Sequence, residues 1–301
     1  MVNYYLAGAI FRGVSSNKTL RQAYRSLGNK KTNRPITLGY TRWIWEQAAK
    51  ADCLTPGKRL LELGTGWTHA NSLYVALAGN AAIDTFDVVD NRSLASLQYQ
   101  VPLVLAAIEV SPDHSDRDKR EARRRAERIA KCASLDEVYE VLNMRYQVND
   151  EPRFLNRTFD FIFAMDVFEH VRRAQFQESV ATWKALLKPG GVLVAQVGLD
   201  DHLSHLDCSK HVKHYLRHSK RVGGLLVESE LKYINRLPAS EILNAFRRAG
   251  FELEFVDREI CDMTGVTVHP DYLDQSPEDL ATARLILMAR RTAAADVLAA
   301  A

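Results

Sequence analysis

The sequence has few cysteines, and they are widely spaced. Cys53, Cys132, Cys208 and Cys261 form no Cys-x-x-Cys pair and no cluster. This pattern is expected of reduced thiols and gives no sign of a disulfide framework. We therefore predict a cytoplasmic location.

Long hydrophobic runs are also missing. The apolar stretch at residues 2–11 is short, contains Asn3 and Gly8, and is stopped by Arg12, with no small-residue cleavage site behind it. A membrane-spanning helix needs about 20 mostly apolar residues, and a signal peptide needs such a cleavage site. The sequence predicts neither.

The chain has no strong excess of charge of either sign. Its 301 residues carry a formal net charge of +3, with 26% charged and 47% hydrophobic residues. This balance neither requires nor excludes a nucleic-acid partner, but the length and apolar content suffice for a full α/β core. We expect one elaborated domain with insertions, and the oligomeric state stays open.

Acidic residues are almost absent from the N-terminal part of the chain. No Asp or Glu precedes Glu46, whereas residues 18–34 are rich in Lys and Arg. We predict a helical, basic N-terminal cap over residues 1–57. Its basic face is either solvated, or closes over a cofactor, or meets an anionic substrate or a membrane surface.

A third glycine is missing from the most informative stretch, which begins at residue 59. An apolar run ending at Glu62 and followed by Gly64 and Gly66 predicts a buried strand, a tight turn and a helix. A dinucleotide fingerprint requires a further glycine where His69 stands, so NAD is disfavoured. The pattern Glu62-x-Gly64-x-Gly66 instead resembles motif I of the class I S-adenosylmethionine (SAM) methyltransferases.

Two later segments carry the same resemblance. Residues 158–171 resemble the family's F-D-x-I…D-V-x-E-H-V, and residues 186–197 resemble its L-L-K-P-G-G-x-L signature. The first of these segments reads as a nearly all-apolar strand, buried on both faces, that runs straight into a helix. The three matches occur in the family's order along one chain.

The resemblance implies a doubly wound α/β fold with a seven-stranded, mostly parallel sheet. The SAM-binding methyltransferase domain would span residues 58–290. Within it, residues 93–145 are more chain than adjacent strands need, and their charged, periodic pattern predicts a helical insertion. Residues 201–237 would form a His-rich substrate segment, and residues 291–301 a C-terminal tail.

The resemblance also implies S-adenosyl-L-methionine as the cofactor and a set of residues that bind it. An acid near the tip of the second strand would accept hydrogen bonds from the ribose hydroxyls, and either Asp87 or Asp90 could do so, with Asp87 favoured by spacing. Near the adenine, Asn149 could substitute for Asp150. The complete implied set is Glu62, Gly64, Thr65, Gly66, Asp87, Asp150, Met165 and Asp166.

The chain after the fifth predicted strand is dense in titratable side chains and opens with Asp200 and Asp201. If the acceptor is a hydroxyl, a general base must remove its proton, and a neutral imidazole is well poised for this near neutral pH. We predict His202 or His205 as the base, with Asp201 or Asp200 as its partner. His170, in the segment after the fourth strand, is a further candidate.

A metal site is the alternative use of the segment that ends at His170. If this segment is helical, Asp166, Glu169 and His170 share one face, and related O-methyltransferases resemble it with E-x-x-E-H and bind a divalent ion there. The shorter Asp at the first position, and the frequency of D-V-x-E-H-V in members without metal, favour a site with no metal.

The sequence thus predicts a SAM-dependent methyltransferase that acts on an oxygen of a small metabolite or of a glycan or lipid precursor. A non-catalytic SAM- or nucleotide-binding module is one alternative. A nucleic-acid methyltransferase is another, but no aromatic-plus-proline motif for a flipped base follows the fourth strand, so a nucleic-acid partner is disfavoured.

Overall fold

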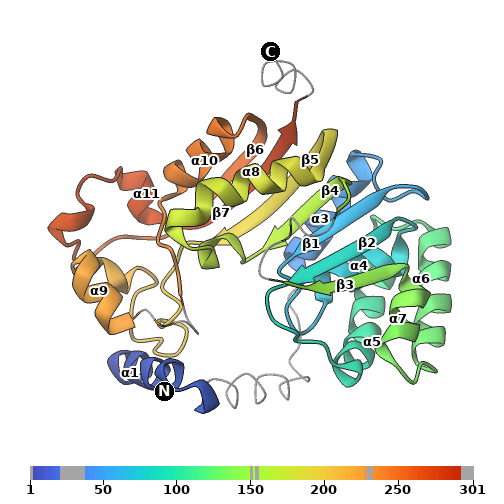
Figure 1. Ribbon diagram of the computed structural model, residues 1–301, viewed down its shortest axis with the longest axis horizontal. Helices are drawn as coiled ribbons and strands as arrows, with labels where there is room; N and C mark the ends of the chain where they lie inside the picture. The colour runs from blue at the N-terminus through green and yellow to red at the C-terminus, as the bar shows by residue number, and fades with distance from the viewer. Residues whose placement is uncertain are drawn as a thin grey trace. The chain divides into compact units, whose positions relative to one another are not determined.

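Seven strands form one sheet in the computed structural model, which describes residues 3–20, 38–149, 152, 156–227, 229 and 233–292. The strand order is β3-β2-β1-β4-β5-β7-β6 (Figure 1). The strands are β1 (Arg59–Leu63), β2 (Ala82–Asp87), β3 (Met144–Val148), β4 (Phe159–Met165), β5 (Leu187–Gly198), β6 (Phe251–Ile260) and β7 (Thr282–Arg291). The order reverses between β1 and β4, which is the mark of a doubly wound sheet. The predicted seven-stranded α/β fold is confirmed.

Two compact units divide the chain. The first comprises residues 1–27, 166–181 and 195–289, and the second comprises residues 28–165, 182–194 and 290–301. The predicted cofactor residues up to Met165 fall in the second unit, whereas Asp166 and the predicted histidines fall in the first. Across the described residues, no helix is both long and apolar enough to cross a membrane.

In the second unit, β4 is central and almost entirely apolar. Its residues from Phe161 to Ala164 are completely buried, and they lie parallel to β1 in the register Leu60↔Phe161 to Leu63↔Ala164. On its other side β1 pairs in parallel with β2, and β2 with β3. A strand covered on both faces reads as a continuous hydrophobic run, as the sequence of β4 does.

The helices of the second unit are α3 (Gly39–Lys50), α4 (Ala70–Ala78), α5 (Leu94–Val110), α6 (Asp116–Ile129) and α7 (Leu135–Leu142). Helices α5, α6 and α7 fall within residues 93–145 and lie beside one another in Figure 1. Ser115 and Asp118 form a reciprocal capping box at the start of α6, and Ser134 caps α7. Each cap contributes about 1 kcal/mol by satisfying amides that have no partner within the helix.

The arginine run of α6 is engaged in contacts within the second unit. Arg123 pairs with Glu109 of α5, and Arg124 pairs with Glu121 one turn away. Arg125 turns inward and donates to the last carbonyl oxygens of α4, including that of Ala76. A cation at a helix C-terminus satisfies unpaired carbonyls and complements the helix dipole. These contacts join α6 to α4 and α5.

The first unit contains α1 (Tyr4–Ser16), α9 (Lys220–Val227), α10 (Ala239–Arg248) and α11 (Pro277–Ala281), together with the short 3₁₀ turns Phe168–His170, Arg173–Gln175, His214–Arg217 and Pro270–Tyr272. Helix α8 (Phe176–Leu186) and strand β5 contribute residues to both units. The expected helix directly after Asp166 is not formed, because the chain there makes two 3₁₀ turns before α8 begins.

Candidate functional site

The glycine turn after β1 has the backbone conformation that its sequence predicts. Gly64 and Gly66 have φ angles of 68° and 64°, in the left-handed region that a side chain disfavours. The amide of Gly64 donates to the carbonyl of Phe86 at 2.8 Å, and Thr65 donates to the same oxygen at 3.2 Å. These bonds join the turn to the end of β2 and fix the backbone in front of α4.

Glu62, at the end of β1, is completely buried. The side-chain amide of Asn71 donates to its Oε1 at 3.2 Å, whereas Oε2 has no hydrogen-bond partner among the described residues. Burial raises the pKa of Glu62 to about 7, although the side chains of Ser72, Asn71 and Thr65 act in the opposite direction. A buried carboxyl oxygen without a partner is costly, so it favours a ligand that supplies a donor.

Asp87 and Asp90 differ in their surroundings. Asp87, at the end of β2, is buried and accepts hydrogen bonds from the amides of Gly66 at 2.8 Å and Val89 at 3.2 Å, and burial raises its pKa. Asp90 is half exposed and forms a two-pronged ion pair with Arg92, which lowers its pKa. Of the two carboxylates, only Asp87 contacts the glycine turn directly.

His69 occupies the position where a dinucleotide fingerprint would have its third glycine. It adopts a left-handed backbone with φ of 52°, precedes α4 and is completely buried. Its Nε2 lies 3.1 Å from the hydroxyl of Tyr139, and its ring stacks on Tyr146 with centroids 5.3 Å apart. Burial lowers its pKa to about 4, so the ring is neutral. The sequence indicated the absence of glycine here but not this aromatic stack.

Two further residues predicted to bind cofactor, Met165 and Asp166, lie at the end of β4. Met165 is half-buried at the end of β4, and Asp166 follows it with φ of 53°. The side-chain amide of Gln196 donates to Asp166 Oδ1 at 2.9 Å, and the Asp166 amide donates to the Gln196 carbonyl at 3.0 Å. Asp150 lies outside the described residues.

In the first unit, Asp200 brings two of the predicted histidines together. His205 Nε2 lies 2.5 Å from Asp200 Oδ2, and His202 Nε2 lies 3.7 Å from Asp200 Oδ1. The rings of His202 and His205 are stacked with centroids 5.6 Å apart, and the ring of His170 lies 5.4 Å from that of His202. All three predicted histidines therefore form one cluster around or next to Asp200.

Asp201, the next residue, makes different contacts from Asp200. It is buried, accepts a hydrogen bond from the Tyr4 hydroxyl at 2.6 Å, and accepts another from the Leu203 amide at 3.1 Å. These contacts bind α1 to the segment that follows β5. Of the two adjacent aspartates, Asp200 is the one that pairs with imidazole.

Three carboxyl groups converge on Gly198, the last residue of β5. A Cβ atom added there would lie 3.1 Å from Glu169 Oε1, 3.4 Å from Asp200 Oδ1 and 3.6 Å from Asp166 Oδ1. Glu169 is completely buried, and neither of its oxygens has a hydrogen-bond partner among the described residues. Burial and the charge of Asp166 raise its pKa well above the usual range. The neutral acid is thereby favoured at Glu169.

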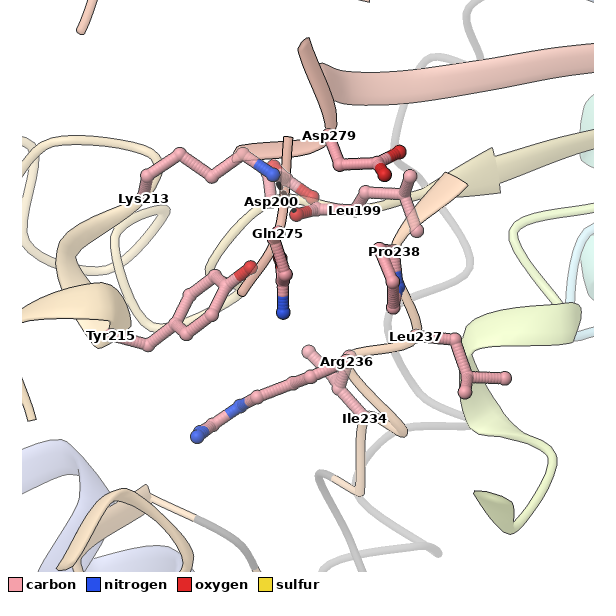
Figure 2. Close-up of a pocket in the computed structure, with 10 residues that line it drawn as sticks. All are labelled: Leu199, Asp200, Lys213, Tyr215, Ile234, Arg236, Leu237, Pro238, Gln275 and Asp279. Carbon is pink, nitrogen blue, oxygen red and sulfur yellow. Dashed lines mark hydrogen bonds between the residues drawn. The ribbon is translucent and has the colours of Figure 1, made fainter. Parts of the chain in front are cut away.

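Asp200 also lines a small cavity (Figure 2). Its volume of about 10 Å³ suits a single water molecule. Lys213 in its wall is buried and donates to the carbonyl of Leu199 at 2.7 Å and to that of Thr282, and burial lowers its pKa to about 8. Arg236 lies over the ring of Tyr215 at 4.9 Å. The contact between Tyr215 and Arg236 could not be predicted from the sequence, because their proximity arises only in the folded chain.

The arrangement that a metal site would use is absent at the end of β4. Asp166 has a left-handed backbone outside any helix, Glu169 is buried, and His170 is exposed with Nδ1 2.7 Å from the Tyr233 carbonyl oxygen. The three side chains therefore do not share a helical face. Within the part of the chain that the structure describes, no group of three His, Cys, Asp or Glu side chains is placed to hold a metal ion.

Comparison with known proteins matches the chain to a family model described as a methyltransferase domain, over residues 39–255. Among solved structures, the chain is similar to magnesium protoporphyrin IX methyltransferase from Synechocystis PCC 6803 with bound SAH, at 15% identity and a TM-score of 0.47, covering 95% of this chain and 99% of that one. It is also similar to an O-methyltransferase family protein from Burkholderia thailandensis, at 12% identity and a TM-score of 0.46, covering 94% and 63%. No curated protein matches by sequence.

Proposed function

The chain belongs to the class I SAM-dependent methyltransferase family, and from this premise we propose that it methylates an oxygen of a small metabolite or of a glycan or lipid precursor. The observation that carries the proposal is the 2.5 Å contact between His205 Nε2 and Asp200 Oδ2. A carboxylate–imidazole pair is a general base, and transfer to a hydroxyl is a reaction that benefits from one.

The second unit contains groups that fit the cofactor. The buried Glu62 Oε2 lacks a partner among the described residues and would accept a hydrogen bond from the ammonium group. Asp87 is fixed by the Gly66 amide and has further lone pairs for two vicinal hydroxyls. Gly64 and Gly66 supply backbone without side-chain bulk, and Thr65, Met165 and Asp150 belong to the same proposed set. Asp166, which falls in the first unit, completes it. When bound, SAM supplies an electrophilic methyl group on a sulfonium.

His205 is the proposed base, with His202 beside it. If His205 donates its Nε2 hydrogen to Asp200, its Nδ1 carries the lone pair that accepts the proton of the acceptor hydroxyl. Bound SAM would supply the methyl group to this oxygen and would leave as S-adenosylhomocysteine. Asp200 stabilises the imidazolium that results. His170, whose ring lies 5.4 Å from that of His202, is the further candidate in this cluster.

Glu169 lies beside the proposed base, because its carboxyl group and that of Asp200 both approach Gly198. Burial and the charge of Asp166 raise the pKa of Glu169 well above its usual range. The contacts of Asp200 with His205 and His202 are proposed to orient the two imidazoles. Asp201 is proposed to fix the N-terminal helix, since its carboxylate is engaged with Tyr4.

The two rival functions make different demands on the chain. A nucleic-acid methyltransferase would use exposed basic side chains, but the arginine run of α6 is engaged with Glu109, Glu121 and the end of α4. A binding module without turnover needs no general base, yet the chain has a clustered group of histidines around a carboxylate. The engaged arginines speak against the nucleic-acid alternative, and the histidine cluster speaks for a catalysed reaction.

The acceptor can be sought directly. Mass spectrometry of ligands that co-purify with the protein would identify candidates, and a screen of cell extracts with methyl-labelled SAM would detect the product. We expect the labelled methyl group on an oxygen of a small metabolite or of a glycan or lipid precursor, and not in the nucleic-acid fraction. Label that enters only RNA or DNA would contradict the proposal and favour the nucleic-acid alternative.

A further inference from the structure

Helix α1 is anchored to the first unit through the face that contains Tyr4. The amide of Tyr4 donates to Asp207 at 3.0 Å, and its hydroxyl donates to Asp201 at 2.6 Å, with both contacts buried. Tyr4 and Ala7 pack with Leu203, and Phe11 lies against this cluster. Positions 4, 7, 8 and 11 fall on one side of a helix, so that side is the anchored face.

The opposite face of α1 is apolar and exposed. It consists of Leu6, Ala9, Ile10 and Gly13, all of them exposed to solvent. Tyr5 lies at its edge, where its hydroxyl is 3.3 Å from His218 Nε2. Leu6 and Ile10 are 55% and 50% exposed, which is high for large aliphatic side chains on a helix that is otherwise anchored. Because the anchoring bonds hold α1 in place, this outer face is a defined surface of the unit and not the side of a loose tail.

Basic side chains lie in α1 and next to it. The helix contains Arg12, Lys18 follows shortly after its last residue, and residues 3–20 include no Asp or Glu. Helix α9 packs beside α1 (Figure 1) and begins with exposed Lys220, Arg221 and Val222. Lys220 is partly balanced by Asp274, whose carboxylate lies 4.0 Å away.

We propose that the outer face of α1 binds the surface of an anionic lipid bilayer. An amphipathic helix with an apolar face and flanking cations lies in the plane of the membrane interface, where apolar burial and attraction to anionic headgroups act together. A nucleic acid would match the charge but not the exposed Leu6 and Ile10. A second copy of the chain would match the apolar face but would bring an equal positive charge against it.

The proposed binding of α1 to the membrane is reversible. One helix of 13 residues offers a small apolar area, so the positive charge contributes a large part of the attraction. Binding would therefore depend on the anionic lipid and on the salt concentration, since the Debye length falls from ~10 Å at about 0.1 M to ~3 Å at about 1 M. It requires neither cofactor nor turnover, so its failure would leave the proposed reaction untouched.

The test is co-sedimentation of the full chain with two kinds of vesicle, one of phosphatidylcholine alone and one that also contains phosphatidylglycerol. We expect the bound fraction to rise at least about tenfold with the anionic lipid, and most of this gain to disappear in high salt. The variant Leu6→Asp/Ile10→Asp should lower the bound fraction at least about tenfold, because it places two charges in the apolar face.

The matched control is Val110→Asp/Leu273→Asp, which makes the same chemical change at sites that are 83% and 66% exposed elsewhere on the chain. It should bind vesicles like wild type, and circular dichroism should show that both double variants are folded. Equal sedimentation with both kinds of vesicle would overturn the proposal. Vesicle binding by Leu6→Asp/Ile10→Asp that equals wild type would also overturn it. A wild-type dimer that becomes a monomer in this variant, with vesicle binding unchanged, would show instead that the face joins two copies of the chain.

Discussion

The carboxylate of Asp87 accepts a hydrogen bond from the amide of Gly66 over 2.8 Å. This bond joins the end of β2 to the glycine turn after β1, at the edge of a parallel sheet where the strands' carboxyl ends lie and where ligands bind. The carboxylate proposed to bind the ribose and the glycine turn are therefore held together by the fold itself.

Replacement of Asp87 should weaken cofactor binding. Asp87→Ala removes charge-assisted hydrogen bonds to the proposed ribose hydroxyls, each worth about 1.5–3 kcal/mol. Titration calorimetry with S-adenosylhomocysteine measures the loss. Asp90→Ala is the matched control, because this carboxylate is paired with Arg92, and it should change affinity far less. The reverse ranking of the two variants would assign the ribose to Asp90.

Glu62 should make the stability of the protein depend on pH. Its ordinary pKa of 4.5 is raised to about 7 in the folded chain. Between these values the unfolded chain loses the proton while the folded chain keeps it, so the free energy of unfolding falls as the pH rises, by roughly 3 kcal/mol. Glu62→Gln should remove this decline, as measured by urea unfolding at a series of pH values.

The exposed Glu127 provides the control for that measurement. Glu127→Gln should leave the pH dependence of wild type unchanged. If the stability curves of wild type and Glu62→Gln run parallel from pH 4.5 to 7, the raised pKa of Glu62 is wrong.

Gly198→Ala should destabilise the fold. Its Cβ would come within 3.1 Å of Glu169 Oε1, a fully buried atom with little room to move. Overpacking of this kind typically costs about 1–3 kcal/mol. Gly39→Ala is the control, because a Cβ there meets nothing within 4 Å. Glu169→Asp shortens the side chain, so combining it with Gly198→Ala should recover part of the loss in a double-mutant cycle. Strictly additive losses would contradict the proposed contact.

Much of the fold could be predicted because its signals are local. The buried run of β4 and the glycines after β1 each specify their own conformation through hydrophobic pattern and backbone freedom. The helix expected after Asp166 was wrong, since the left-handed backbone at Asp166 is stabilised by Gln196, a contact 30 residues away in sequence. A sequence pattern carries no information about such a partner.

The candidate base shows the same limit more sharply. Asp200 and Asp201 are neighbours with the same chemistry, and the sequence left open which would pair with a histidine. In the folded chain Asp201 contacts Tyr4, almost 200 residues away, and this leaves Asp200 to the imidazoles. The burial of Glu169, which decides its charge state, likewise depends on packing and not on its place in the motif.

The histidines should matter for turnover and not for cofactor binding. His205→Ala and His202→Ala should each lower kcat by roughly 10²-fold, because each removes a group from the proposed base. Asp200→Asn should lower kcat in the same direction by leaving the imidazole without its charged partner. His218→Ala, in the same segment but outside the cluster, should keep wild-type kcat. Affinity for S-adenosylhomocysteine should stay near wild type in all four variants.

The most direct test is the rate of labelled methyl transfer from SAM to an identified hydroxyl acceptor, measured for wild type and for His202→Ala/His205→Ala across pH. The account predicts that the double variant binds S-adenosylhomocysteine normally, loses at least about 10²-fold in kcat at neutral pH, and regains part of the rate when rising pH ionises the acceptor without a base. Full activity of the double variant at neutral pH would contradict the assignment of the Asp200–histidine group as the general base.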